Sequence, residues 1–137
     1  MLKTLTPNMM VEDVGATAGW YRSTLGFEVT AEVPSENGEP AFAIAKRDAV
    51  QVMFQSRASL TEELPVLEGA PIGASQTFYI EVDGVDALRQ QVEGKAEIVS
   101  DLHDTFYGTR EFYFRDPNGY ILSFSETIAG SEASNPS

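Results

Sequence analysis

Hydrophobic and polar residues alternate near the end of the chain, and this alternation predicts a β-hairpin. Tyr120, Leu122 and Phe124 fall on one face of the return strand, because successive side chains of a strand point to opposite faces. The residues before them, 116–119, read Asp-Pro-Asn-Gly, and proline, asparagine and glycine each suit a tight turn. We therefore predict two strands within 104–126, the second with a core face.

Two other stretches carry the spacing of an amphipathic helix. The first begins at Asp13, a favourable N-cap, and stops at Gly26. The second begins at Asp83 or Asp86 and stops at Gly94. The apolar stripes are Val14, Ala18, Tyr21 and Leu25 in the first and Val85, Leu88 and Val92 in the second. Each helix thus has one face to bury.

Short runs with strand character surround these helices. They cover 5–11, 27–33, 41–46 and 50–55 in the first half, and 77–82, 96–100 and the hairpin in the second, with a loop at 101–108. The order β-α-β-β-β therefore occurs twice. This pattern predicts an α+β fold built from duplicated β-α-β-β-β units.

The domain organisation follows from the same pattern. We predict one domain over residues 1–126, with a first unit at 4–55, a connector at 56–75 and a second unit at 76–126. Within the connector, Ser59-Leu-Thr-Glu62 resembles a capping box, which predicts a short helix. Residues 127–137 are small and polar, so we predict a disordered tail.

Charge narrows the range of partners. The chain of 137 residues has 9 basic and 21 acidic residues, for a formal net charge of −12. Nucleic acids and anionic membranes are unfavourable partners, because phosphate binding needs a basic surface. The acidic residues either keep the surface soluble or attract cationic ligands.

Composition also bears on location and chemistry. The chain has no cysteine, which excludes disulfides and thiolate chemistry. Residues 1–7 lack the apolar run of a signal peptide, and no stretch approaches the length of a membrane span. We therefore expect a cytoplasmic location.

Taken together, these features resemble the vicinal oxygen chelate superfamily, which contains glyoxalase I, extradiol dioxygenases, fosfomycin-resistance thiol transferases and bleomycin-resistance proteins. The resemblance rests on the paired units, on 20–27 (Trp-Tyr-Arg-Ser-Thr-Leu-Gly-Phe) and on the hairpin at 107–120, and it covers about residues 4–126. It implies curved mixed sheets around a cavity, usually in a homodimer that can exchange halves. The fold hosts several chemistries, so it does not by itself assign one.

Enzymes of that superfamily hold a metal ion with His, Glu or Gln at matching points of the two units. The resemblance places Thr6, Thr77 and Ser123 at these points, and a fourth near Met53. Hydroxyl and thioether groups bind a divalent first-row metal poorly, and the single histidine, His103, lies elsewhere. We therefore predict neither a metal nor another cofactor. A shift of one residue in strand register would place nearby glutamines at the ligand positions. A displaced metal site, as in a glyoxalase-like lyase or dioxygenase, therefore remains an alternative.

Strand alternation and the resemblance together select the candidate ligand-binding residues. They are Asn8, Met10, Met53, Tyr79, Glu81, His103, Tyr107, Glu111, Tyr113 and Ser123. Their aromatic rings, hydroxyls and carboxylates suit an organic ligand with rings and amines, through stacking, cation–π contacts and charge-assisted hydrogen bonds.

Several candidates have plainer explanations. Tyr113 could equally pack between sheets, and Glu111 beside Arg110 is more simply explained as an ion pair at a strand edge. His103 with Asp104 and Tyr107 forms the best acid–base cluster, but a lone loop histidine is more often a surface residue. We therefore assign no catalytic residue.

The sequence thus predicts a metal-free small-molecule binding protein of the bleomycin-resistance type. It would act as a homodimer and sequester a cationic or aromatic compound such as an antibiotic. The alternatives are the lyase or dioxygenase with a displaced metal site, and a non-catalytic partner subunit.

Overall fold

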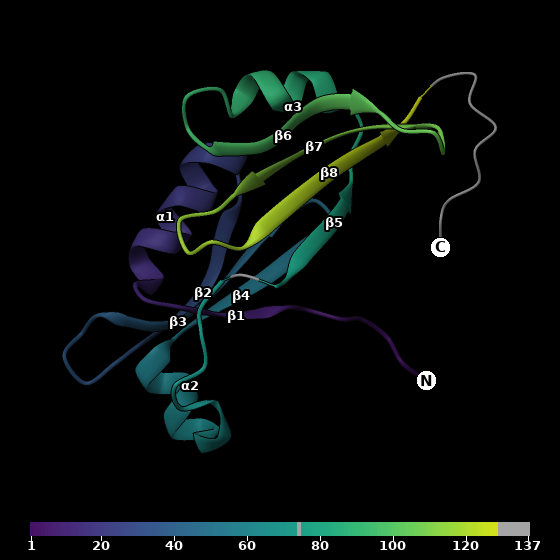
Figure 1. The fold of residues 1–137 in the computed structure, drawn as a ribbon. Coiled ribbons are helices and arrows are strands. Elements are labelled where there is room, and N and C mark those ends of the chain that lie inside the picture. Colours follow the sequence, from purple (N-terminus) through teal and green to yellow (C-terminus); the bar gives the residue numbers. More distant parts are fainter. Residues whose placement is uncertain (74, 129–137) are drawn as a thin grey trace. The chain divides into compact units, whose positions relative to one another are not determined.

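The computed structural model describes residues 1–73 and 75–128, and its elements follow the predicted β-α-β-β-β order twice (Figure 1). The strands are β1 (Asn8–Val11), β2 (Glu28–Pro34), β3 (Pro40–Arg47), β4 (Val50–Ser56), β5 (Thr77–Glu81), β6 (Glu97–Asp104), β7 (Thr109–Arg115) and β8 (Ile121–Thr127). The helices are α1 (Val14–Leu25), α2 (Arg57–Glu63) and α3 (Val85–Gln91), with a short 3-10 helix at Pro65–Leu67.

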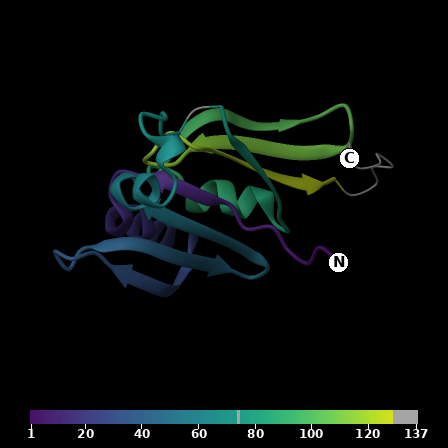
Figure 2. The same ribbon diagram turned by 90° about the horizontal axis from the view of Figure 1, so that it is seen from below.

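The chain forms two compact units, Met1–Gly73 and Ala74–Ser137, with the same strand order in each. The first sheet has the order β1-β4-β3-β2 and the second the order β5-β8-β7-β6 (Figure 1 and Figure 2). In each sheet the first strand of the unit pairs in parallel with the last, and the remaining pairs are antiparallel. The described residues therefore form two four-stranded mixed sheets with three α-helices, which confirms the predicted α+β fold.

Helix α1 forms where the apolar stripe and its caps predict it. The side chain of Asp13 accepts a hydrogen bond from the N–H of Ala16 at 2.9 Å, and Gly26 ends the helix with a φ of 72°. Tyr21 is only 1% exposed and packs against Phe54 of β4, with 4.8 Å between the ring centroids. The helix thus covers one face of the first sheet.

Replacing Asp13 with alanine is expected to lower the free energy of unfolding by about 1 kcal/mol, because the N–H of Ala16 loses its acceptor. Urea unfolding measures this loss. Asp13→Ser is the matched control, since a serine hydroxyl also caps a helix and should recover most of the stability. Equal losses in both variants would contradict the capping role.

The second unit buries the face that the hairpin pattern predicts. Tyr120, Leu122 and Phe124 are each at most 6% exposed. Phe112 and Phe114 of β7 lie beside Phe124, and the three rings have centroids 5.5 to 6.0 Å apart. Helix α3 packs against β7 and β8, and its buried residues include Val85 and Leu88. These side chains form the core of the second unit.

Three local predictions near strand and helix ends were wrong. Strand β1 begins at Asn8 rather than at residue 5. The first half of the predicted loop at 101–108 is strand, because β6 continues to Asp104 past an irregular pairing between Ser100 and His103. Helix α2 is capped by Ser56 instead of Ser59, since the hydroxyl of Ser56 accepts from the Ser59 N–H at 3.2 Å.

At the C-terminal end, β8 includes Thr127, the first residue of the predicted tail. Residues 129–137 of that tail lie outside the described residues. Of the helices that the structure describes, none is long and apolar enough to cross a membrane.

Candidate ligand-binding site

The register of the second sheet brings most of the candidate residues to one face. Ser123 of β8 lies between Tyr79 of β5 and Tyr113 of β7, and Ser125 lies between Glu81 and Glu111. Because aligned residues of neighbouring strands point to the same side, all six side chains share the face opposite the phenylalanine core. The alternation of residues in the sequence predicted this arrangement.

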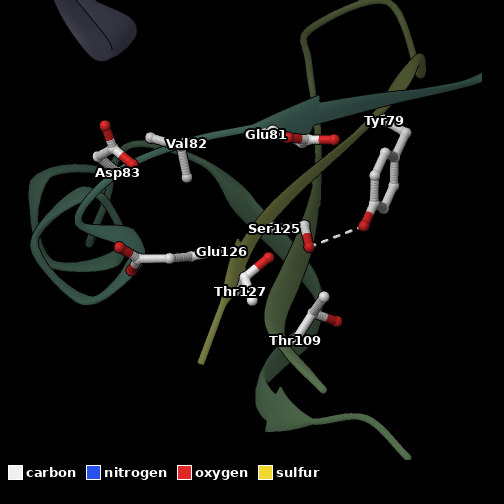
Figure 3. A pocket seen from close by; sticks show the side chains of 8 residues that line it. All are labelled: Tyr79, Glu81, Val82, Asp83, Thr109, Ser125, Glu126 and Thr127. Atoms are coloured by element: carbon white, nitrogen blue, oxygen red, sulfur yellow. Dashed lines mark hydrogen bonds between the residues drawn. The ribbon is translucent and has the colours of Figure 1, made fainter. Parts of the chain in front are cut away.

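A cavity of about 370 Å³ opens on the second unit where strands β5 and β8 end (Figure 3). Its described lining is Tyr79, Glu81, Val82, Asp83, Thr109, Ser125, Glu126 and Thr127. Three of these side chains are carboxylates, and none carries a positive charge. The cavity is therefore an acidic site with one aromatic wall.

Six of the eight described lining residues were not among the candidate ligand-binding residues. One of them, Ser125, lies on the face that the sequence predicted. Thr109 and Thr127 extend the same alternation by one step on β7 and β8, so the pattern contained a signal for them. The cavity is also lined by Val82, Asp83 and Glu126, because the ends of strands β5 and β8 lie close together. The local sequence pattern gives no signal for this arrangement.

Beneath the cavity lies Glu111, a carboxylate that is only 1% exposed. Among the described residues, five hydroxyl groups lie within hydrogen-bond distance of it: Tyr113 Oη at 2.7 Å, Thr109 Oγ1 at 2.8 Å, Ser125 Oγ at 3.1 Å, Tyr107 Oη at 3.1 Å and Tyr79 Oη at 3.2 Å. The single proton of Tyr79 is directed either to Glu111 or to Ser125. We call Glu111 and these five residues the hydroxyl cluster. Its saturation with donors explains how a charge can be buried there.

The expected ion pair between Glu111 and Arg110 was wrong. Arg110 instead binds Asp104 at 2.7 Å and Asp86 at 3.2 Å. The reason is strand alternation, which turns the side chains of neighbouring residues on β7 to opposite faces of the sheet.

The electrostatics of the hydroxyl cluster favour an ionised carboxylate and neutral phenols. Burial alone would raise the pKa of Glu111, but the hydrogen bonds from Tyr113, Thr109, Ser125 and Tyr107 outweigh burial and hold that pKa below its ordinary value. Burial together with the nearby Glu111 charge raises the pKa of Tyr79, Tyr107 and Tyr113. The cluster is thus a buried anion solvated by hydroxyl groups.

The lowered pKa of Glu111 predicts a pH-dependent contribution to stability. A group whose pKa is lower in the folded than in the unfolded chain stabilises above its ordinary value of 4.5, and this stabilisation is lost as the pH falls through the folded value. Urea unfolding of the natural chain and of Glu111→Gln should therefore differ most at neutral pH. The difference should shrink below about pH 4.5. A difference independent of pH would contradict an ionised Glu111.

His103 joins the hydroxyl cluster through Tyr113. Its Nε2 lies 3.4 Å from the Tyr113 hydroxyl, and the two rings meet edge to face with centroids 5.3 Å apart. The other ring nitrogen, Nδ1, lies 2.8 Å from the backbone oxygen of Asp101. Asp104 forms its ion pair with Arg110, and it also lies within electrostatic reach of His103. The expected place of His103 in a loop is wrong, since it lies on β6.

Glu126 links the cavity to helix α3. Its two carboxylate oxygens accept the backbone N–H groups of Gly84 and Val85, each at 2.9 Å. These bonds hold the pKa of Glu126 below its ordinary value. The prediction that the helix begins at Asp83 or Asp86 was wrong, because Gly84 takes the N-cap position with a φ of 83°.

The candidates of the first unit lie together on one face of its own sheet. Asn8 is aligned with Met53, and Met10 with Gln55. The Asn8 amide donates to Gln55 Oε1 at 2.8 Å, and the Gln55 amide donates to Ser59 Oγ at 3.0 Å. Met10 is buried. These contacts give the face a fixed polar row beside two methionines.

The residues at the superfamily's metal positions do not fit a transition metal. Thr6 accepts a hydrogen bond from the Gln51 amide at 3.3 Å, and Ser123 lies between two tyrosines. In the parts of the chain that are described, no three His, Cys, Asp or Glu side chains gather in a way that could hold a metal ion. Hydroxyl groups and the Met53 thioether are poor ligands for such ions.

The chain belongs to the glyoxalase/bleomycin resistance protein/dioxygenase superfamily, whose family model matches residues 4–124. This finding confirms the family resemblance and leaves the branch within the superfamily unassigned. A search of curated proteins found no significant match.

Solved structures show the same fold at low sequence identity. TioX from Micromonospora sp. ML1 is 19% identical, with a TM-score of 0.73, 93% of this chain and 100% of that chain covered. A glyoxalase/bleomycin resistance protein/dioxygenase from Nocardioides is 19% identical, with a TM-score of 0.76 and coverage of 100% and 91%. A glyoxalase-related enzyme from Clostridium phytofermentans is 20% identical, with a TM-score of 0.73 and coverage of 93% and 97%.

Proposed function

We propose that the protein is a metal-free binding protein of the bleomycin-resistance type, which sequesters a small cationic and aromatic compound such as an antibiotic. The observation that carries this proposal is the cavity of the second unit. Glu81, Asp83 and Glu126 supply negative charge there, and the Tyr79 ring supplies an aromatic surface. No described lining residue would neutralise the carboxylates.

The physical basis is complementarity between the cavity and its ligand. Carboxylates bind ammonium or guanidinium groups through charge-assisted hydrogen bonds, and the face of a tyrosine ring attracts a cation or stacks on another ring. The net charge of −12 adds a long-range field that favours the approach of cations. Candidate residues Tyr107, Tyr113 and His103 would support the site through the hydroxyl cluster.

A thermal-shift and calorimetry screen tests this proposal. The probes are bleomycin-type cationic glycopeptides and aromatic amines, with neutral and anionic compounds of similar size as controls. A ligand present at 100 times its dissociation constant should stabilise the folded chain by about 2.7 kcal/mol. Failure of every cation to bind, or equal binding of the anionic controls, would overturn the proposal.

Elemental analysis of protein purified without chelator provides a second check. The donor groups present predict no stoichiometric transition metal. One Zn, Ni, Mn or Fe per chain would instead support a lyase or dioxygenase with a displaced metal site.

We also propose a homodimer, which the superfamily resemblance implies. Light scattering should then give a mass of about twice the 15.0 kDa of one chain. A monomer at working concentrations would overturn this part of the proposal and leave the cavity proposal standing.

A further inference from the structure

We propose that the cavity selects cations that carry hydrogen-bond donors, because its own side chains chiefly offer acceptors. It should bind an ammonium or guanidinium group that carries N–H donors more tightly than a quaternary ammonium of the same charge. This inference rests on the proposed function, because it names the class of cation that the same cavity takes. It is carried by the hydroxyl cluster, which fixes the direction of three hydroxyl protons in the cavity wall, those of Tyr79, Thr109 and Ser125.

Two hydroxyl groups of the cavity wall are buried. Thr109 and Ser125 are 6% and 2% exposed, and both donate to Oε2 of Glu111. A hydroxyl group has one proton to donate and two lone pairs that accept. Because the protons point to Glu111, neither group has a donor left for a ligand.

Tyr79 is 47% exposed and forms the aromatic wall of the cavity. Its hydroxyl lies 2.8 Å from Ser125 Oγ and 3.2 Å from Glu111 Oε2, so its proton points into the cluster in either case (Figure 3). Only lone pairs of Tyr79 Oη remain for a ligand. A phenol that donates towards an anion is also a stronger acceptor, because chains of hydrogen bonds polarise one another.

Three carboxylates complete the polar lining of the cavity. An ionised carboxylate accepts hydrogen bonds and donates none. Glu126 stays ionised because the N–H groups of Gly84 and Val85 lower its pKa, and Glu81 and Asp83 lie on the same wall. The side-chain oxygens around the cavity therefore act chiefly as acceptors, which a ligand satisfies only by bringing donors.

A matched set of small probes tests the inference. They are 2-phenylethylammonium, its N,N,N-trimethyl analogue and 2-phenylethanol, which keep the ring and change only the head group. Binding is measured from shifts of backbone amide resonances, with Gly84, Val85 and Ser125 as reporters at the cavity. The primary ammonium should bind at least about tenfold more tightly than the quaternary one, as expected for hydrogen bonds to charged groups. The alcohol should bind most weakly.

Tyr79→Phe separates hydrogen bonding from ring contact. It keeps the aromatic wall and removes the Oη acceptor, so binding of the primary ammonium should fall while binding of the quaternary ammonium is retained. Phe106→Leu is the control, because it changes an aromatic residue of the second unit that is 99% exposed and does not line the cavity. Its preference should match that of the natural chain.

The possible results distinguish selection by hydrogen bonding from the binding of a cationic ligand as such. Equal binding of the two cations overturns hydrogen-bond selection and leaves the cationic ligand standing. Failure of both cations to bind, or tighter binding of the alcohol than of the primary ammonium, overturns both. The ratio in the natural chain decides the matter even if Tyr79→Phe does not fold.

Discussion

Replacing Glu111 with leucine should lower the free energy of unfolding by about 3 kcal/mol. The buried hydroxyls of Thr109 and Ser125 would lose their acceptor, and a buried donor without a partner costs about 1–3 kcal/mol. The tyrosines of the hydroxyl cluster are less buried, so they can turn to water at a smaller cost. Relief of the buried charge should not cancel this loss, because the lowered pKa shows that hydrogen bonding outweighs burial. Urea unfolding at neutral pH measures the change.

Two other variants make that measurement specific. Glu111→Gln keeps one acceptor oxygen, so it should cost less than leucine. Glu97→Gln alters an exposed carboxylate of β6 that pairs with Arg115, and exposed ion pairs contribute about 0–1 kcal/mol. If Glu111→Leu were no more harmful than Glu97→Gln, the hydroxyl cluster would have no structural role.

Replacing Phe114 with alanine should have the largest effect on stability, a loss of about 3–5 kcal/mol. The ring is fully buried, and it stacks on Phe124 with planes only 7° apart and on Phe112. Removing it leaves a cavity on the core face of the second sheet, beside the rings of Phe112 and Phe124. Thermal and urea unfolding both report the loss.

The control for this variant is Val99→Ala on the neighbouring strand β6. Val99 is 44% exposed, so its truncation should change the free energy of unfolding by no more than about 0.5 kcal/mol. A loss at Phe114 as small as the one at Val99 would show that the aromatic stack does not hold the second unit together.

The sequence predicted those features of the fold that local physics determines. The turn at 116–119 is one example, because Asp116 Oδ1 accepts the N–H groups of Asn118 and Tyr120 at 2.8 and 3.0 Å. Gly119 has a φ of 92° there, which a residue without a side chain adopts freely. The two faces of β8 were likewise predictable, because strand alternation has no other solution once one face is apolar.

The parts that the sequence did not reveal depend on contacts between distant residues. Glu111 was expected to pair with its neighbour in sequence, and its actual donors come from three strands and a turn. Glu126 caps a helix that begins about forty positions earlier in the chain, and no capping motif records such a partner. Strand β6 extends past its expected end because His103 and Asp104 pair with Glu111 and Arg110 of β7, a pairing that resumes after an irregular stretch.

The parallel strand pairs, β1 with β4 and β5 with β8, also affect the order in which the strands pair during folding. In each unit the three antiparallel strands are neighbours in sequence and can pair early. Strand β1 can pair only after β4 has formed, and β5 only after β8. Closing so long a loop costs chain entropy before any contact repays it, so these pairings set the slow step. During synthesis, the first strand of each unit could therefore pair only after the last strand of that unit had been synthesised.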